Sequence, residues 1–71
     1  MSDLGARLLD AHGARDRAAL VGLYAEAADN VSNPDAAAFY LTHAYVYALE
    51  LNHPSAPALR ARLVASGRER E

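Results

Sequence analysis

The sequence predicts an all-α protein in which four helices form an array around a central antiparallel helix pair. Three observations favour this fold. Residues 33–54 form one run that is apolar on nearly all sides, with a helix start signal at one end and a proline at the other. No segment alternates apolar and polar residues between turn signals, as a strand would. The serines fall at the expected helix ends, where capping accounts for them.

The first helix is expected over residues 3–11, with Ser2 or Asp3 as its N-cap. Its apolar side consists of Leu4, Leu8 and Leu9. Gly13 follows closely and is predicted to end the helix as the C′ residue, because glycine adopts the left-handed conformation that this position favours.

The second helix is expected over residues 15–31 and has the clearest amphipathic pattern of the chain. Its apolar stripe comprises Leu20, Leu23, Tyr24, Ala27 and Val31, with Val21 and Ala28 beside it. Ser32 and Asn33 form a short connection to the next helix. A connection of this length predicts that the second and third helices lie antiparallel.

The third helix is expected over residues 34–52. Asn33 is suited to the N-cap and Pro34 to the first helical position, while Pro54 prevents the helix from continuing. A helix with almost no polar face is normally a central one. Its small residues form a stripe that suits close packing, either against the second helix or against a second copy of the chain. This stripe comprises Ala37, Leu41, Ala44, Ala48 and Leu51.

The fourth helix is expected over residues 55–66, ending at Gly67. Pro57 falls in its first turn, where no backbone N–H is needed. The inward side is predicted to comprise Ala56, Leu59, Leu63 and Val64.

The chain of 71 residues, 1–71, is expected to form one small domain. A core of this size rarely supplies more than about 3–5 kcal/mol unless a disulfide, a metal or a partner subunit adds to it. The chain contains no cysteine, so neither a disulfide nor a thiolate metal site is available. Self-association is therefore the expected source of additional stability.

The net charge of −2 is too small to indicate nucleic acid or an anionic membrane as a partner. No apolar run is long enough to span a bilayer. The N-terminal residues lack the pattern of a signal peptide, so a cytoplasmic location is expected.

The charges are unevenly distributed along the chain. Between residues 18 and 59 the charged side chains are all acidic, whereas four arginines follow from Arg60 onward. These two groups can attract each other within one chain or across a dimer. The simpler interpretation, an ordinary solvated helix surface, is favoured because exposed ion pairs contribute little.

The second and third helices together resemble a tetratricopeptide-repeat (TPR or Sel1-like) hairpin. The residues that carry the resemblance are Leu23, Tyr24, Ala27 or Ala28, Tyr45, Ala48 and Pro54, with Leu41 where the family usually has alanine. The tryptophan and glycine of the family pattern have no counterpart, and the pattern occurs once. The resemblance covers about half of the chain and implies a helical hairpin with two flanking helices. It also implies a protein-binding or self-associating role.

The histidines, His12, His43 and His53, are the candidates for metal binding or acid–base chemistry. His43 has no carboxylate or second histidine three or four residues away, which is the spacing that a helical zinc site requires. We interpret His43 as a packing residue bonded to a carbonyl or a tyrosine, and His12 and His53 as helix-end residues.

Tyrosines are concentrated on the third helix, where Tyr40 and Tyr47 share a face. Such a face can close the core or form an interface, and these two alternatives carry equal weight. A third alternative, a small-molecule pocket, is less favoured than either. The candidate interaction residues are Tyr40, His43, Tyr45, Tyr47 and Leu51.

The leading hypothesis is a non-enzymatic interaction module that forms a homodimer through the third and fourth helices and can bind a further protein. It has no catalytic residues, no metal and no cofactor. The alternative is an accessory protein that binds a small ligand or a metal at His43, Tyr40 and Tyr47.

Overall fold

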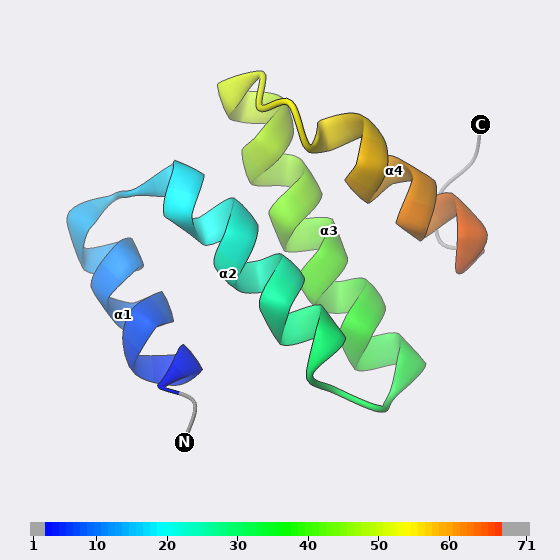
Figure 1. Ribbon diagram of the computed structural model, residues 1–71, viewed down its shortest axis with the longest axis horizontal. Helices are drawn as coiled ribbons and strands as arrows, with labels where there is room; N and C mark the ends of the chain where they lie inside the picture. Colours follow the sequence, from blue (N-terminus) through cyan, green and yellow to red (C-terminus); the bar gives the residue numbers. More distant parts are fainter. Residues whose placement is uncertain (1–2, 68–71) are drawn as a thin grey trace.

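The computed structural model describes residues 3–67, and within this range the protein is all-α, with four helices and no strands. The helices are α1 (Leu4–Ala14), α2 (Arg17–Asp29), α3 (Pro34–Leu51) and α4 (Ala56–Ala65). Each packs against its neighbour in the sequence, and the α2–α3 contact is the most extensive (Figure 1). Helices α2 and α3 lie antiparallel, as the short connection predicts. The array is flat, with Cα extents of 33 × 28 × 13 Å.

The end of α1 differs from the prediction that Gly13 terminates it. Gly13 lies inside the helix, and the left-handed residue is Arg15, with φ 56°. The reason lies in the next helix, because the Asp16 side chain accepts a hydrogen bond from the Ala19 N–H at 3.1 Å and caps α2. The turn is therefore completed at Arg15, directly before this cap. At the other end Asp3 is the N-cap residue without a side-chain cap bond, and Ser2 lies outside the described residues.

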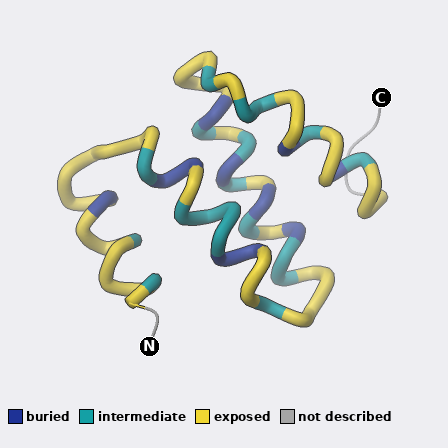
Figure 2. Tube along the Cα trace, in the orientation of Figure 1, coloured by how far each residue is buried: buried dark blue, intermediate teal, exposed yellow. Residues whose placement is uncertain are grey.

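The buried residues of α2 all come from the predicted apolar stripe and from the two positions beside it. Val21 and Ala28 belong to the core cluster shared with α3 and α4. Leu20 and Ala27 are also buried but lie outside this cluster, on a side of α2 rotated by about 100° from the first. Helix α2 contacts both α3 and α1, and helix α1 is itself mostly exposed (Figure 2). It ends at Asp29, two residues earlier than predicted, and the Asn30 amide donates to the Glu26 carbonyl at 2.8 Å.

Helix α3 begins where its sequence indicates. The Asn33 side-chain oxygen accepts hydrogen bonds from the N–H groups of Asp35 and Ala36, at 2.8 and 3.2 Å. The helix ends at Leu51, because Asn52 adopts the left-handed conformation with φ 53°. Asparagine tolerates this conformation better than most residues.

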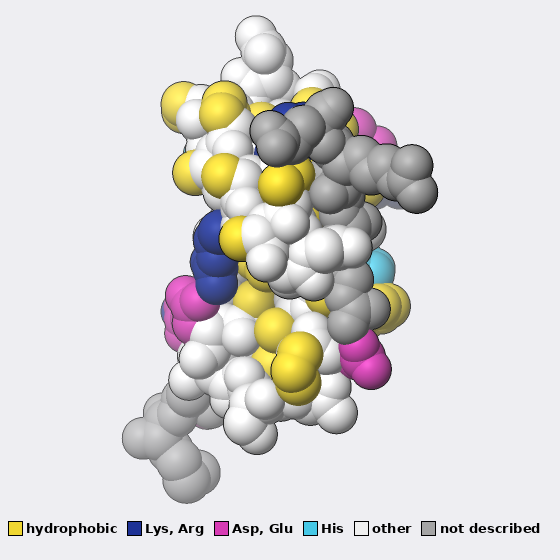
Figure 3. Space-filling model, turned by 90° about the vertical axis from the view of Figure 1, so that its right-hand side faces the viewer, with side chains coloured by type: hydrophobic (Ala, Val, Ile, Leu, Met, Phe, Trp, Pro, Cys, Tyr) yellow, Lys and Arg dark blue, Asp and Glu magenta, His cyan; other side chains and the backbone are white. Residues whose placement is uncertain are grey.

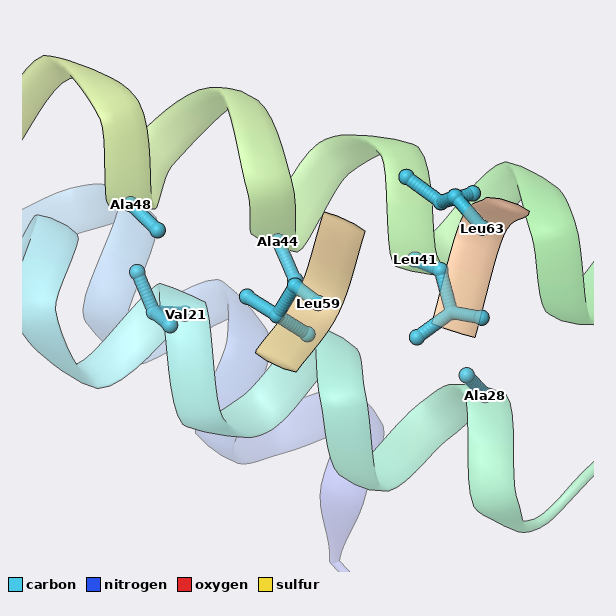
Figure 4. Close-up of a cluster of buried hydrophobic side chains, with 7 residues drawn as sticks. All are labelled: Val21, Ala28, Leu41, Ala44, Ala48, Leu59 and Leu63. Atoms are coloured by element: carbon cyan, nitrogen blue, oxygen red, sulfur yellow. The ribbon is translucent and has the colours of Figure 1, made fainter. Parts of the chain in front are cut away.

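The alanine side of α3 forms the centre of the core. Ala44 and Ala48 are fully buried at 0% exposure, and Leu41 is 5% exposed. Ala48 points toward Val21 and Leu41 toward Ala28, so α3 lies close to α2 (Figure 4). The small-residue stripe could pack either against the second helix or against a second copy of the chain. These three residues of the stripe pack within the chain, against α2.

Helix α4 covers the α2–α3 pair through Leu59 and Leu63, which are 4% and 2% exposed and complete the same cluster (Figure 4). Both were predicted to face inward. A peripheral ion pair adds to this contact, with Arg62 of α4 donating to Asp29 of α2 at 2.6 Å. Basic and acidic side chains meet at one edge of the molecule (Figure 3). The acidic middle and the basic end of the sequence therefore meet within one chain here, at half-exposed positions where such a pair stabilises little.

Candidate interaction surface on helix α3

The tyrosine side of α3 is covered by Tyr24 of α2. The Tyr24 ring stacks against three rings of α3, with centroids 6.1 Å from Tyr40, 5.1 Å from His43 and 6.0 Å from Tyr47. Offset stacking at these separations is a favourable arrangement of aromatic rings. This side of α3 thus contributes first to contacts within the chain.

Helix α1 reaches the same aromatic cluster through His12. The His12 Nε2 atom lies 2.8 Å from the Tyr24 hydroxyl, and its ring meets the rings of Tyr24 and Tyr47 edge-on at 5.9 and 6.4 Å. Three helices therefore share one group of rings, and the contact fixes the end of α1 against the hairpin.

The other two histidines also have partners inside the chain. His43 Nδ1 donates to the Phe39 carbonyl at 2.9 Å, and the two rings lie 4.4 Å apart. His53 Nδ1 accepts from the N–H of Ser55 at 3.1 Å and lies 2.8 Å from its hydroxyl. The interpretation of His43 as a packing residue bonded to a carbonyl is confirmed. Within residues 3–67 no three histidine or acidic side chains are grouped as a metal ion would need.

Burial raises the pKa of Tyr24 above its ordinary value of 10.0, and the neighbouring Tyr47 and Tyr40 raise it further. The folded state therefore disfavours the ionised phenol. The neutral Tyr24 side chain therefore contributes to the free energy of unfolding. This contribution is fully present below about pH 10 and is lost as the pH rises from there through the raised pKa. We expect the free energy of unfolding, measured by urea denaturation, to fall above about pH 10. Tyr24→Phe should show a shallower fall, and an equal fall in both proteins would contradict this assignment.

The structure places the five candidate interaction residues in different surroundings. Tyr40, His43 and Tyr47 are half-buried in the aromatic cluster. Tyr45 is half-buried against the core cluster, and Leu51 is 39% exposed. Their part in an interface remains a prediction.

A different side of α3 is open to solvent. Phe39, Val46 and Leu49 are 58%, 46% and 55% exposed, and the exposed Thr42 lies between them. We call these four residues the outer ridge. Sequence reasoning missed it because it considered only the small-residue side and the tyrosine side of this helix and did not group Phe39, Val46 and Leu49. The available signal was the spacing of 3, 4 and 3 residues along the ridge, which keeps all four on one side of a helix.

Two shallow depressions flank the outer ridge. One, of about 300 Å³, is lined by Thr42, His43, Val46, Tyr47 and Glu50. The other, of about 280 Å³, lies where α3 meets α4 and is lined by Tyr45, Leu49, Ala56, Pro57 and Arg60. Hydrophobic side chains also reach the surface on the side of the molecule that carries α4 (Figure 3). Thr42 and Val46 of the ridge line the first depression and Leu49 lines the second, so the ridge adjoins both.

A larger groove of about 610 Å³ lies between α1 and α2. Its floor contains small side chains, and Arg7 of α1 pairs with Glu26 of α2 at its margin. This groove is open and has charged side chains along its sides, so it differs in character from the apolar surface of α3.

The comparisons with known proteins give no relative: no family model, no curated protein and no solved structure matches the chain. Within the described part of the chain, no helix combines the length and the apolar character needed to cross a bilayer.

Proposed function

We propose that this protein is a non-enzymatic interaction module that forms a homodimer through the outer side of α3. One observation carries the proposal, the exposure of Phe39, Val46 and Leu49 along a single helix side. Single exposed apolar residues are normal in small proteins, but contiguous ones with a shaped surface around them are typical of protein-binding sites. Thr42 is the only polar member of the ridge, and its side chain donates to the Ala38 carbonyl at 2.8 Å.

The small size of the core supports the same proposal. The shared cluster contains Ala28, Ala44 and Ala48 among its seven buried residues, so much of its area comes from methyl groups. Each buried CH₂ or CH₃ group stabilises by only about 0.8 kcal/mol. A second copy that covers the outer ridge would add apolar burial that the 71-residue chain lacks.

The TPR-like character of the α2–α3 hairpin belongs to this proposal as well. In that family a helical hairpin presents surfaces to other proteins, and a single hairpin needs neighbours to bury its faces. Here α1 and α4 each cover one side of the hairpin. We place the module in the cytoplasm, and a further protein partner is compatible with the open groove between α1 and α2.

Val46→Asp tests the proposal because it places a charge at the middle of the outer ridge. In a two-fold dimer the substitution acts twice, and burying unpaired carboxylates is costly. We expect light scattering at micromolar concentration to give a dimer for the natural sequence. For Val46→Asp we expect a monomer with unchanged helical circular dichroism, the dissociation constant rising by at least about 100-fold.

Leu9→Asp is the matched control, because Leu9 is 74% exposed on α1, away from the ridge. This variant should remain dimeric. A monomeric natural protein, or a Val46→Asp variant that still dimerises, would overturn the proposal. If Leu9→Asp gave a monomer and Val46→Asp did not, the interface would lie on α1 and the proposed interface on α3 would be wrong.

A further inference from the structure

The geometry points to one arrangement of the dimer, in which two copies of α3 pack antiparallel with a two-fold axis level with Ala44. This inference rests on the proposed homodimer and adds its orientation and its contacting residues. The outer ridge of one copy is thus covered by the outer ridge of the second copy.

The spacing of the ridge is the first argument. The intervals from Phe39 to Thr42, to Val46 and to Leu49 are 3, 4 and 3 residues, so the pattern reads the same in both directions. When a second helix runs in the opposite direction, Phe39 lies opposite Leu49 of the second copy, and Thr42 lies opposite its Val46. Alternating spacings of three and four residues are those of a coiled-coil seam, in which each side chain inserts between residues of the facing helix.

The charges of α3 favour the antiparallel direction. Asp35 and Glu50 are the charged residues of this helix, and both are acidic. A parallel pair would bring each carboxylate next to its own copy, where like charges repel. The antiparallel pair separates the two Glu50 residues by about 18 Å and the two Asp35 residues by about 27 Å along the helix axis. Both separations exceed the screening length of about 8 Å at physiological salt.

The depressions beside the ridge make the surface self-complementary. In the antiparallel arrangement, Phe39 of one copy lies over the end of the 300 Å³ depression that Val46 and Glu50 of the other copy form. The two-fold axis repeats this contact, so both phenyl rings are covered. Ridges that pack into neighbouring grooves are the normal mode of helix association.

The size of a standard dimer interface indicates how much of this surface a second copy has to cover. A standard interface covers about 800 Å² on each partner, which is about one-sixth of the 4734 Å² surface of this chain. Helix α3 has 18 residues and is therefore about 27 Å long. We expect the interface to extend from the ridge over both flanking depressions, so residues of α4 around Ala56 and Pro57 form its rim.

Disulfide cross-linking tests the orientation, and the absence of natural cysteines makes each introduced cysteine a clean probe. Thr42→Cys and Val46→Cys proteins, carrying tags of different mass, are mixed and oxidised. The antiparallel arrangement predicts a mixed disulfide between them, because residues 42 and 46 face each other. Leu49→Cys alone should remain uncross-linked, since its two copies lie about 15 Å apart along the axis, beyond the reach of a disulfide.

Leu9→Cys measures cross-linking by random collision, because Leu9 is exposed on α1. A Leu49→Cys disulfide above this background would overturn the antiparallel arrangement in favour of a parallel one. A dimer by light scattering without the mixed disulfide would overturn the arrangement while the dimer itself stands. A monomer by light scattering would overturn the proposed function and this inference together.

Discussion

Ala44→Leu is expected to remove a large part of the protein's free energy of unfolding. Ala44 has 0% exposure and lies on the side of α3 that packs against both α2 and α4. Adding three carbon atoms there forces neighbouring side chains or whole helices apart, which costs typically 1–3 kcal/mol, and more where the backbone cannot shift. A core of this size supplies about 3–5 kcal/mol in total, so the loss is a large part of the whole stability and should lower the urea midpoint strongly.

The measurement is urea denaturation followed by far-ultraviolet circular dichroism, at one protein concentration for all variants, because dimerisation makes stability concentration-dependent. Ala61→Leu is the matched control, since Ala61 is exposed in the middle of α4 and leucine is nearly as good a helix former as alanine. This control should unfold at nearly the same urea concentration as the natural protein. Equal stability of Ala44→Leu and Ala61→Leu would contradict the packing described for α3.

Local chemistry made most of the fold predictable from the sequence. The start of α3 was predictable because Asn33 and Pro34 each have one strong positional preference, and the Asn33 cap bonds are present. The inward residues of α4 were predictable because Leu59 and Leu63 recur at the spacing of one helix turn. The short connection at Ser32 and Asn33 was sufficient to indicate the antiparallel hairpin.

The end of α1 was less predictable because two signals competed. Gly13 is suited to a C′ position, but Asp16 is an equally good N-cap for α2. The cap at Asp16 prevails, and the left-handed turn falls on Arg15 although arginine has no preference for it. The conformational preference of one residue does not determine where a helix ends when the next helix begins only three residues after that end, as α2 does after α1.

The candidate surface was the least predictable feature. Periodicity shows which residues share a side of α3 but not which neighbouring helix covers that side. Tyr24 from α2 and His12 from α1 cover the tyrosine side, and this depends on contacts between residues far apart in the sequence. The ridge carrying Phe39 and Val46 is consequently the side left open.

Leu63→Ala is expected to release α4 from the hairpin and to destabilise the protein by about 2–4 kcal/mol. Leu63 is 2% exposed, and together with Leu59 it forms the buried part of the α4 contact. The remaining ion pair between Arg62 and Asp29 is half-exposed and cannot replace the lost apolar contact. Urea denaturation measures the loss, and hydrogen exchange shows where the chain opens.

The expected exchange pattern is specific to the array. Because α4 lies at one end of the array, with α3 as its main neighbour, its amides should lose protection first, while those of α2 and α3 follow with the global unfolding. Val64→Ala is the matched control, since the neighbouring Val64 is half-buried and loses less area. Leu63→Ala should also weaken the dimer, because α4 forms one wall of the depression beside Leu49. A Leu63→Ala protein that keeps full protection in α4 would show that this helix is held by contacts other than the shared core.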